Sequence, residues 1–167
     1  MTPLGLWLRV CAGTALAVGS LVLLPVRTPS MHLSIGTAGV LGCVGGACLF
    51  AGLARKRPQA RLDGWSRRDW ARSSFLVLWA GVEEAIWRRL ALGAIALHTD
   101  WATALAASTV AFAVTHRSGR STQLVTGLAF GSIYVLTGQL VAAIAMHAVY
   151  NLLLDRALGH RPSARPA

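Results

Sequence analysis

Two adjacent glutamates, Glu83 and Glu84, lie inside an otherwise apolar stretch of the sequence. The 167-residue chain has six acidic residues in all, so placing two of them together in such a stretch needs a reason. An ionised side chain at the centre of a bilayer costs about 2.5 kcal/mol or more, and intramembrane carboxylates therefore mark candidate functional sites. A carboxylate shielded from water is also suited to take up and return a proton during acid–base catalysis.

The two carboxylates can have different roles because of their positions on a helix. Glu84 and Arg88 are four residues apart, a spacing that lets an acidic and a basic side chain meet on one helix face. Glu83 points about 100° away around the helix axis and faces another environment. We therefore expect arginine to hold Glu84 in place and Glu83 to face a cavity.

Two later segments repeat the four-residue spacing with imidazole groups. They contain Phe112 with His116, and His147 with Asn151. Glu83 and His116 together could deprotonate a water molecule. His147 and Asn151 could donate two hydrogen bonds to one developing oxyanion, a type of interaction that often dominates catalysis.

Each of these patterns also has a structural interpretation. A Glu–Arg pair at this spacing can be a structural ion pair, a histidine at a helix end can be an interfacial residue, and H-x-x-x-N can join two helices. Two Glu and two His could also ligate zinc or iron. However, neither H-E-x-x-H nor Glu-x-x-His occurs in the sequence, and Arg88 would oppose a cation. We expect no metal and no other cofactor.

The composition is that of an integral membrane protein. Hydrophobic residues make up 54% of the chain and charged residues 13%, against about 25% charged in soluble domains. The net charge of +10 comes from basic clusters between apolar segments, as the positive-inside rule describes for cytoplasmic loops. No nucleic-acid-binding motif is present, so the expected partner is the lipid bilayer and not nucleic acid.

Six apolar segments must position the polar groups, and each is predicted to be a membrane-spanning helix. They cover residues 4–26, 32–54, 73–97, 99–115, 121–137 and 139–158. The predicted fold is an all-α polytopic membrane helix bundle. Residues 1–158 form a single membrane domain with its catalytic core at 73–154, and residues 159–167 form a disordered basic tail.

The basic loop at 55–72, in which Ser66 could cap a short helix lying in the membrane interface, sets the predicted orientation. It contains seven of the basic residues between the second and third spans, so we place it and both termini in the cytoplasm, with the multi-pass protein in a bacterial plasma membrane. His116 then ends its span near the cytoplasmic face, whereas the glutamates lie deeper. Either the helix over 99–115 stops short and the following turn enters a cavity, or the boundaries are shifted by a few residues.

Together, the strings E-E-x-x-x-R, F-x-x-x-H and H-x-x-x-N resemble the CPBP family. This family of CAAX proteases and bacteriocin-processing enzymes, also called Abi, includes the type II CAAX prenyl endopeptidases. The three strings occur in this order over residues 73–154. The resemblance implies an intramembrane glutamic endopeptidase without an essential metal.

The resemblance also implies roles for the individual residues. Glu83 and His116 would activate the hydrolytic water, and His147 and Asn151 would form the oxyanion hole. Glu84, counted among the catalytic residues, and Arg88 would position and support Glu83, and Phe112 would be a further supporting residue. The implied substrate is a membrane-embedded or lipidated protein or peptide. A non-enzymatic membrane protein, conferring immunity to a peptide toxin or acting as a scaffold, is the alternative.

Overall fold

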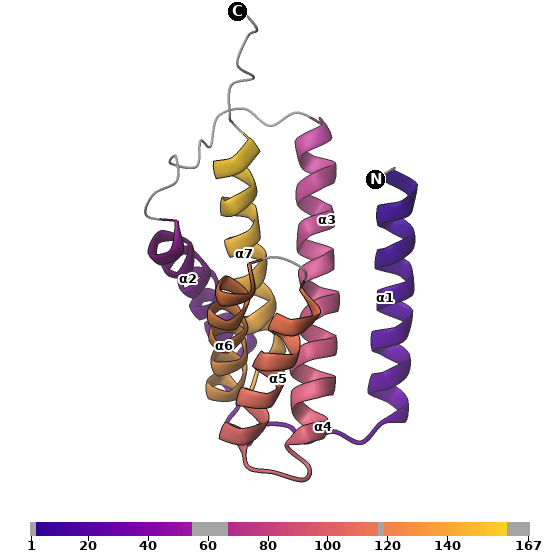
Figure 1. Ribbon diagram of the computed structural model, residues 1–167, viewed down its shortest axis with the longest axis vertical. Helices are drawn as coiled ribbons and strands as arrows, with labels where there is room; N and C mark the ends of the chain where they lie inside the picture. The colour runs from indigo at the N-terminus through magenta and orange to yellow at the C-terminus, as the bar shows by residue number, and fades with distance from the viewer. Residues whose placement is uncertain (1–2, 55–66, 117–118, 160–167) are drawn as a thin grey trace, which may run out of the picture.

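The structure is a bundle of helices (Figure 1). The computed structural model describes residues 3–54, 67–116 and 119–159, and every element within these ranges is helical. The helices are α1 (Pro3–Leu23), α2 (Ile35–Leu53), α3 (Arg67–Glu84), η1 (Ala85–Leu92), α4 (Gly93–Ile95), α5 (Trp101–Thr115), α6 (Arg120–Thr137) and α7 (Leu140–Gly159). The predicted all-α class is confirmed.

The helix that carries the two glutamates is longer than predicted. α3, η1 and α4 follow one another without a break, so the helical segment begins at Arg67 and not at residue 73. Residues 67–72, predicted as loop or as part of a short interfacial helix capped by Ser66, instead form the first part of this long helix. Residues 55–66, Ser66 among them, lie outside the described ranges. Asp69 in the first turn favours this early start, because an acidic side chain stabilises the positive end of the helix dipole. Of the predicted tail, Gly159 belongs to α7 and the remainder lies outside the described residues.

The distribution of side chains fits a membrane environment. Large apolar side chains are exposed along α1 and α2, with Val22 78% and Ile35 69% accessible, while Glu84 and Arg88 are completely buried. Within the described residues, α2 and α7 are the helices long and apolar enough to cross a bilayer. The count of six spans and the cytoplasmic position of both termini remain predictions.

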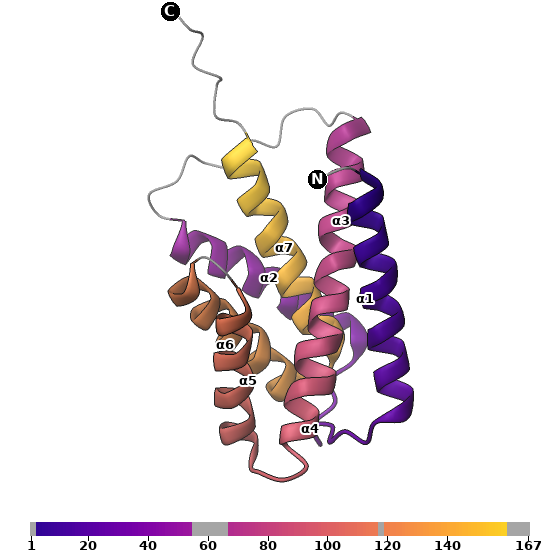
Figure 2. The ribbon, with the colours of Figure 1, turned by 45° about the vertical axis from the view of Figure 1, so that its right-hand side comes forward.

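α7 is the central helix, and α2, α3 and α6 all pack against it. Figure 2 shows α2 crossing α7 obliquely. Two glycines allow the backbones to approach closely, as small residues commonly do between membrane helices. Gly42 faces the carbonyl of Ala142, and a Cβ atom at Gly46 would lie 2.5 Å from the carbonyl oxygen of Met146. This crossing fixes the part of α7 that carries the neighbouring His147.

The α5–α6 hairpin is shorter than the helices beside it. α5 has 15 residues, about 22 Å of helix, which is less than the roughly 30 Å thickness of a bilayer core. It ends at Thr115 with His116 as its cap, and α6 begins after Gly119, whose φ of 67° suits glycine. Figures 1 and 2 show this end of the hairpin part-way along α3 and α7. The helix therefore stops short, which is the first of the two predicted alternatives.

The opposite end of the bundle is held by contacts between connecting segments. The backbone N–H of Arg27 donates to Gly93, and its guanidinium donates to Ala96 and stacks 5.5 Å from the Trp101 ring.

Asp100 caps α5. Hydrogen bonds to its carboxylate, first of all from the backbone N–H of Thr103, hold the pKa of this exposed group below its usual range.

Candidate active site

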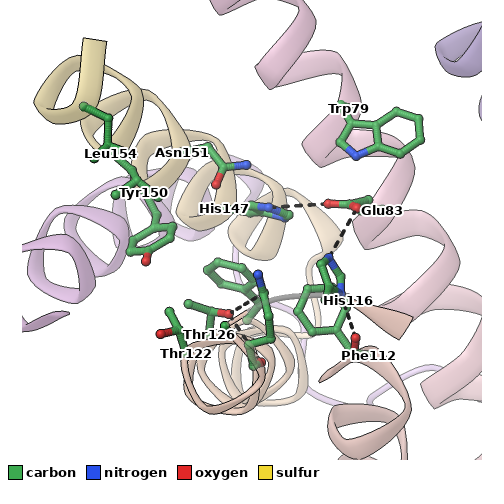
Figure 3. Close-up of a pocket in the computed structure, with 14 residues that line it drawn as sticks. Trp79, Glu83, Phe112, His116, Thr122, Thr126, His147, Tyr150, Asn151 and Leu154 are labelled. Atoms are coloured by element: carbon green, nitrogen blue, oxygen red, sulfur yellow. Dashed lines mark hydrogen bonds and ion pairs between the residues drawn. The ribbon is translucent and has the colours of Figure 1, made fainter. Parts of the chain in front are cut away.

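Four helices surround one cavity in the middle of the bundle (Figure 3). Its volume is about 470 Å³, which lies within the range of small-ligand sites. Glu83 of α3, His116 at the end of α5, and His147 and Asn151 of α7 all line it. The structure therefore brings together the four side chains that the sequence placed around a common pocket.

Glu84 lies behind the cavity in a completely buried hydrogen-bonded group. One carboxylate oxygen accepts from Nε of Arg88 at 2.9 Å, and the other accepts from Nδ1 of His147 at 2.8 Å. Glu84 and Arg88 are both 0% exposed. Glu84 thus links the arginine to the imidazole of another helix, and it sets the orientation of the His147 ring.

Glu83 faces the cavity, as its position on the helix predicts. Its Oε1 lies 3.9 Å from Nε2 of His116, and its Oε2 lies 3.6 Å from Nε2 of His147. Figure 3 shows dashed lines that join the carboxylate to both imidazoles. Each oxygen of Glu83 therefore has a different histidine as its neighbour.

The two histidines are oriented in the same way. Nδ1 of His116 lies 2.7 Å from the carbonyl oxygen of Phe112, which can only accept a hydrogen bond, so Nδ1 carries a proton. The same carbonyl also accepts a hydrogen bond from the Thr115 hydroxyl, so two side chains bind it in the last turn of α5. Nδ1 of His147 donates to Glu84 in the same manner. In both rings Nε2 is left to face Glu83.

Phe112 supports the site from the side. Its ring packs against His116 at a centroid distance of 4.4 Å and against the edge of Trp87. The guanidinium of Arg88 lies 5.2 Å from the same ring, an arrangement that stabilises a cation. Nη1 and Nη2 of Arg88 have no hydrogen-bond partner within the described residues, so the ring face and Glu84 are its contacts there.

Three features of the site were not predicted from the sequence. Trp79, one helical turn before Glu83, lines the cavity with its indole N–H toward that carboxylate, and a search for the same four-residue spacing could have found it. Phe130 of α6 stacks on the His147 ring at 4.6 Å, a long-range contact without a local sequence signal. Arg88 lies in the π-helical segment η1, a distortion that occurs frequently at functional sites.

No group of three or more His, Cys, Asp and Glu side chains with the geometry to hold a metal ion occurs in residues 3–54, 67–116 and 119–159. The cavity instead offers a carboxylate, two imidazoles and a carboxamide, the set used for proton transfer and for hydrogen bonding to an oxyanion.

Fold and site together define a helical bundle with an acid–imidazole cavity in its core. A family model, Rce1-like type II CAAX prenyl endopeptidase, matches residues 68–153, and the chain belongs to this family. The predicted family is confirmed, and every predicted site residue lies within the matched range. At the level of the family the protein is a CAAX protease-type endopeptidase from a membrane-embedded group. Neither a curated protein nor a solved structure matches the chain.

Proposed function

We propose that the protein hydrolyses a peptide bond of a membrane-associated protein or peptide with a water molecule activated by Glu83. The observation that carries this proposal is the position of Glu83, whose oxygens face Nε2 of two different histidines at 3.6 and 3.9 Å. These separations exceed a direct N–H···O hydrogen bond, and polar gaps of this size are commonly bridged by water. A water between Glu83 and His116 would be held by both groups.

The first step is attack of this water on the scissile carbonyl carbon. Glu83 accepts one proton of the water while the new C–O bond forms and the carbonyl π electrons move to oxygen. The protonated Glu83 then gives that proton to the nitrogen of the leaving amine, and the C–N bond breaks as the oxyanion electrons re-form the carbonyl double bond. One group thus serves as general base and then as general acid.

His147 and Asn151 are the proposed donors to the oxyanion. Nδ1 of His147 already donates to Glu84, so Nε2 can donate only when the ring is an imidazolium. The charges of Arg88 and His147 are then balanced by Glu84 and, before the attack, by Glu83; once Glu83 has taken the proton, the oxyanion carries the second negative charge. This balance of charges offsets the free-energy cost of burying a charged His147.

Asn151 follows His147 by one helical turn on α7. Figure 3 shows its carboxamide beside that ring and facing the same cavity. A carboxamide N–H donates without any change of protonation state. The pair therefore combines one charged donor with one neutral donor, on a single rigid helix.

The proposed substrate is embedded in the bilayer or carries a lipid anchor, and the proposed location is the bacterial plasma membrane. The family and the apolar exterior of α1 and α2 support a membrane-associated substrate and a membrane location. The cavity lies where the α5–α6 hairpin stops short of the ends of α3 and α7.

A comparison of membrane proteomes tests the proposal. Cells that produce the wild-type protein should contain protein C-termini that are absent from cells producing Glu83→Gln at equal abundance. Asp155→Asn is the matched control, since Asp155 is not a cavity residue and pairs with Arg72. If the Glu83→Gln cells contain the same set of C-termini as the wild type, the proposed hydrolysis is wrong.

A further inference from the structure

The cavity extends beyond the proposed catalytic groups into a branch between α6 and α7. One wall of this branch consists of Thr122, Gln123 and Thr126 on α6, and the other of Tyr150, Leu154 and Leu158 on α7. None of these six side chains carries a charge. Figure 3 shows Thr122 and Thr126 on one side of the cavity, with Tyr150 and Leu154 on the side of α7. The branch therefore has one polar wall and one wall that is largely apolar.

The polar wall is organised by hydrogen bonds within α6. Thr122 and Thr126 are four residues apart and share a helix face. The hydroxyl of Thr126 lies 3.3 Å from Oε1 of Gln123 and 3.4 Å from the Gln123 carbonyl oxygen. Thr126 donates to Oε1, so this bond leaves the NH2 group of Gln123, a cavity-lining residue, available as a donor. Gln123 is itself partly buried, so this donor matters for anything that enters the branch.

A polar wall opposite an apolar wall is suited to an extended peptide. A peptide backbone that enters a cavity shielded from water must find hydrogen-bond partners, because an unpaired buried amide costs several kcal/mol. Extended recognition of this kind obtains affinity from main-chain hydrogen bonds and specificity from side-chain pockets. Gln123 and Thr122 offer hydrogen bonds to the peptide main chain. Leu154 and Leu158 offer an apolar surface to its side chains.

We propose that the α6–α7 branch is the subsite for the substrate residues next to the scissile bond, with Gln123 donating to a substrate backbone carbonyl and Leu154 and Leu158 contacting a neutral, apolar substrate side chain. This inference rests on the proposed function, since it assigns the binding path of the same site. Gln123 is a positioning residue and takes no part in proton transfer. We expect a charged substrate residue at this position to be rejected, because none of the described side chains that line the branch carries a charge.

The test uses the full chain purified into proteoliposomes and an internally quenched farnesylated peptide of the CAAX type as the probe. Gln123→Met keeps the length of the side chain and removes its donor. Ser121→Ala is the matched control, since it removes an exposed hydroxyl of the same helix that does not line the cavity. We expect Gln123→Met to raise KM about tenfold, as the loss of one hydrogen bond predicts, with kcat little changed. Ser121→Ala should leave both constants as in the wild type.

Two changes to the probe separate recognition from general damage to the protein. Replacing the bonded backbone amide by an ester weakens the carbonyl acceptor, so it should raise KM for the wild type and have little further effect on Gln123→Met. Placing aspartate at the apolar position should abolish cleavage by the wild type. An unchanged KM in Gln123→Met, or a lower kcat at unchanged KM, would overturn the assignment of Gln123. Equal cleavage of the aspartate probe would overturn the apolar subsite.

Binding distinguishes this inference from the proposed function. The same probe is titrated by fluorescence anisotropy against Glu83→Gln and against Glu83→Gln combined with Gln123→Met. Weaker binding to the double variant supports the subsite, whether or not the wild type cleaves the probe. Absence of cleavage by the wild type would count against the proposed hydrolysis but not against the subsite. Equal binding to both proteins, or a probe that the wild type neither binds nor cleaves, rejects the subsite.

Discussion

At the residue scale, the site depends on which atom of each side chain faces the cavity. The carbonyl of Phe112 and the carboxylate of Glu84 each occupy Nδ1 of one histidine, so both rings present Nε2 to Glu83. The two adjacent glutamates also differ in which groups their oxygens face. Glu84 is buried and bonded on both oxygens, whereas Glu83 is the one that borders the cavity.

Substitution of the two glutamates should therefore have opposite consequences for stability. Glu84→Gln removes the charge that pairs with the completely buried Arg88, and leaving a buried charge unpaired costs about 3–5 kcal/mol. Glu83→Gln removes a carboxylate that has no direct hydrogen bond to either histidine, so the fold should remain as stable as the wild type or become more stable. Thermal unfolding of both variants in detergent provides the comparison. A Glu83→Gln protein with the larger loss of Tm would indicate a packing role for Glu83, as in the non-enzymatic alternative.

The residue types of the site and the different directions of Glu83 and Glu84 were predictable, but the contacts between helices were not. The spacing of Glu84 and Arg88 predicts their ion pair, and that of His147 and Asn151 predicts a shared face, because both pairs are local on a helix. Contacts between helices have no such local signal. The hydrogen bond from His147 to Glu84 joins residues 63 positions apart and depends on how α7 packs on α3.

At the element scale, helix lengths and crossings set the depth of the catalytic groups. The short α5 brings His116 to the level of Glu83, and the close α2–α7 crossing fixes the height of His147. The sequence predicted the end of α5 at Thr115 correctly, since polar residues follow it. It did not predict the π-helical turns of η1, because these depend on packing against other helices.

The glycines of the crossing provide a test at this scale. Gly46→Ala would place a methyl group 2.5 Å from the Met146 carbonyl oxygen and 2.9 Å from Cβ of Val149, and overpacking of this kind costs about 1–3 kcal/mol. We expect a lower Tm and a lower rate of cleavage, because α7 must shift. Gly39→Ala on the same helix is the control, since no atom lies within 4 Å of a Cβ there. A Gly46→Ala protein as stable as Gly39→Ala would mean that the helices are not in close contact.

At the scale of the whole molecule, the bundle has two distinct ends. The beginning of α1, the beginning of α3 and the end of α7 lie at one end, as Figure 1 shows, and the α4–α5 connection lies at the other. This arrangement is consistent with an even number of membrane crossings from the beginning of α1 to the end of α7. The predicted orientation places the first end in the cytoplasm, where the basic loop belongs.

Cysteine labelling tests this orientation in the intact chain. In a background where Cys11, Cys43 and Cys48 are replaced by alanine, His98→Cys should react with a membrane-impermeant maleimide added to whole cells. Ala54→Cys should react only after the membrane is permeabilised, because it lies at the end of α2 next to the basic loop. The reverse pattern would show that the basic loop is outside and that the positive-inside argument fails for this protein.

The most direct test of the account is the kcat/KM of purified Glu83→Gln in proteoliposomes, measured on the internally quenched peptide with EDTA present and with Tm recorded for the same preparation. We expect a wild-type enzyme that remains active in the chelator, and a variant with an unchanged Tm and a rate lower by about 100-fold to 10,000-fold, the usual contribution of a general base. A correctly folded Glu83→Gln protein that cleaves the peptide as fast as the wild type would contradict the account, as would a wild-type activity that EDTA abolishes and zinc restores.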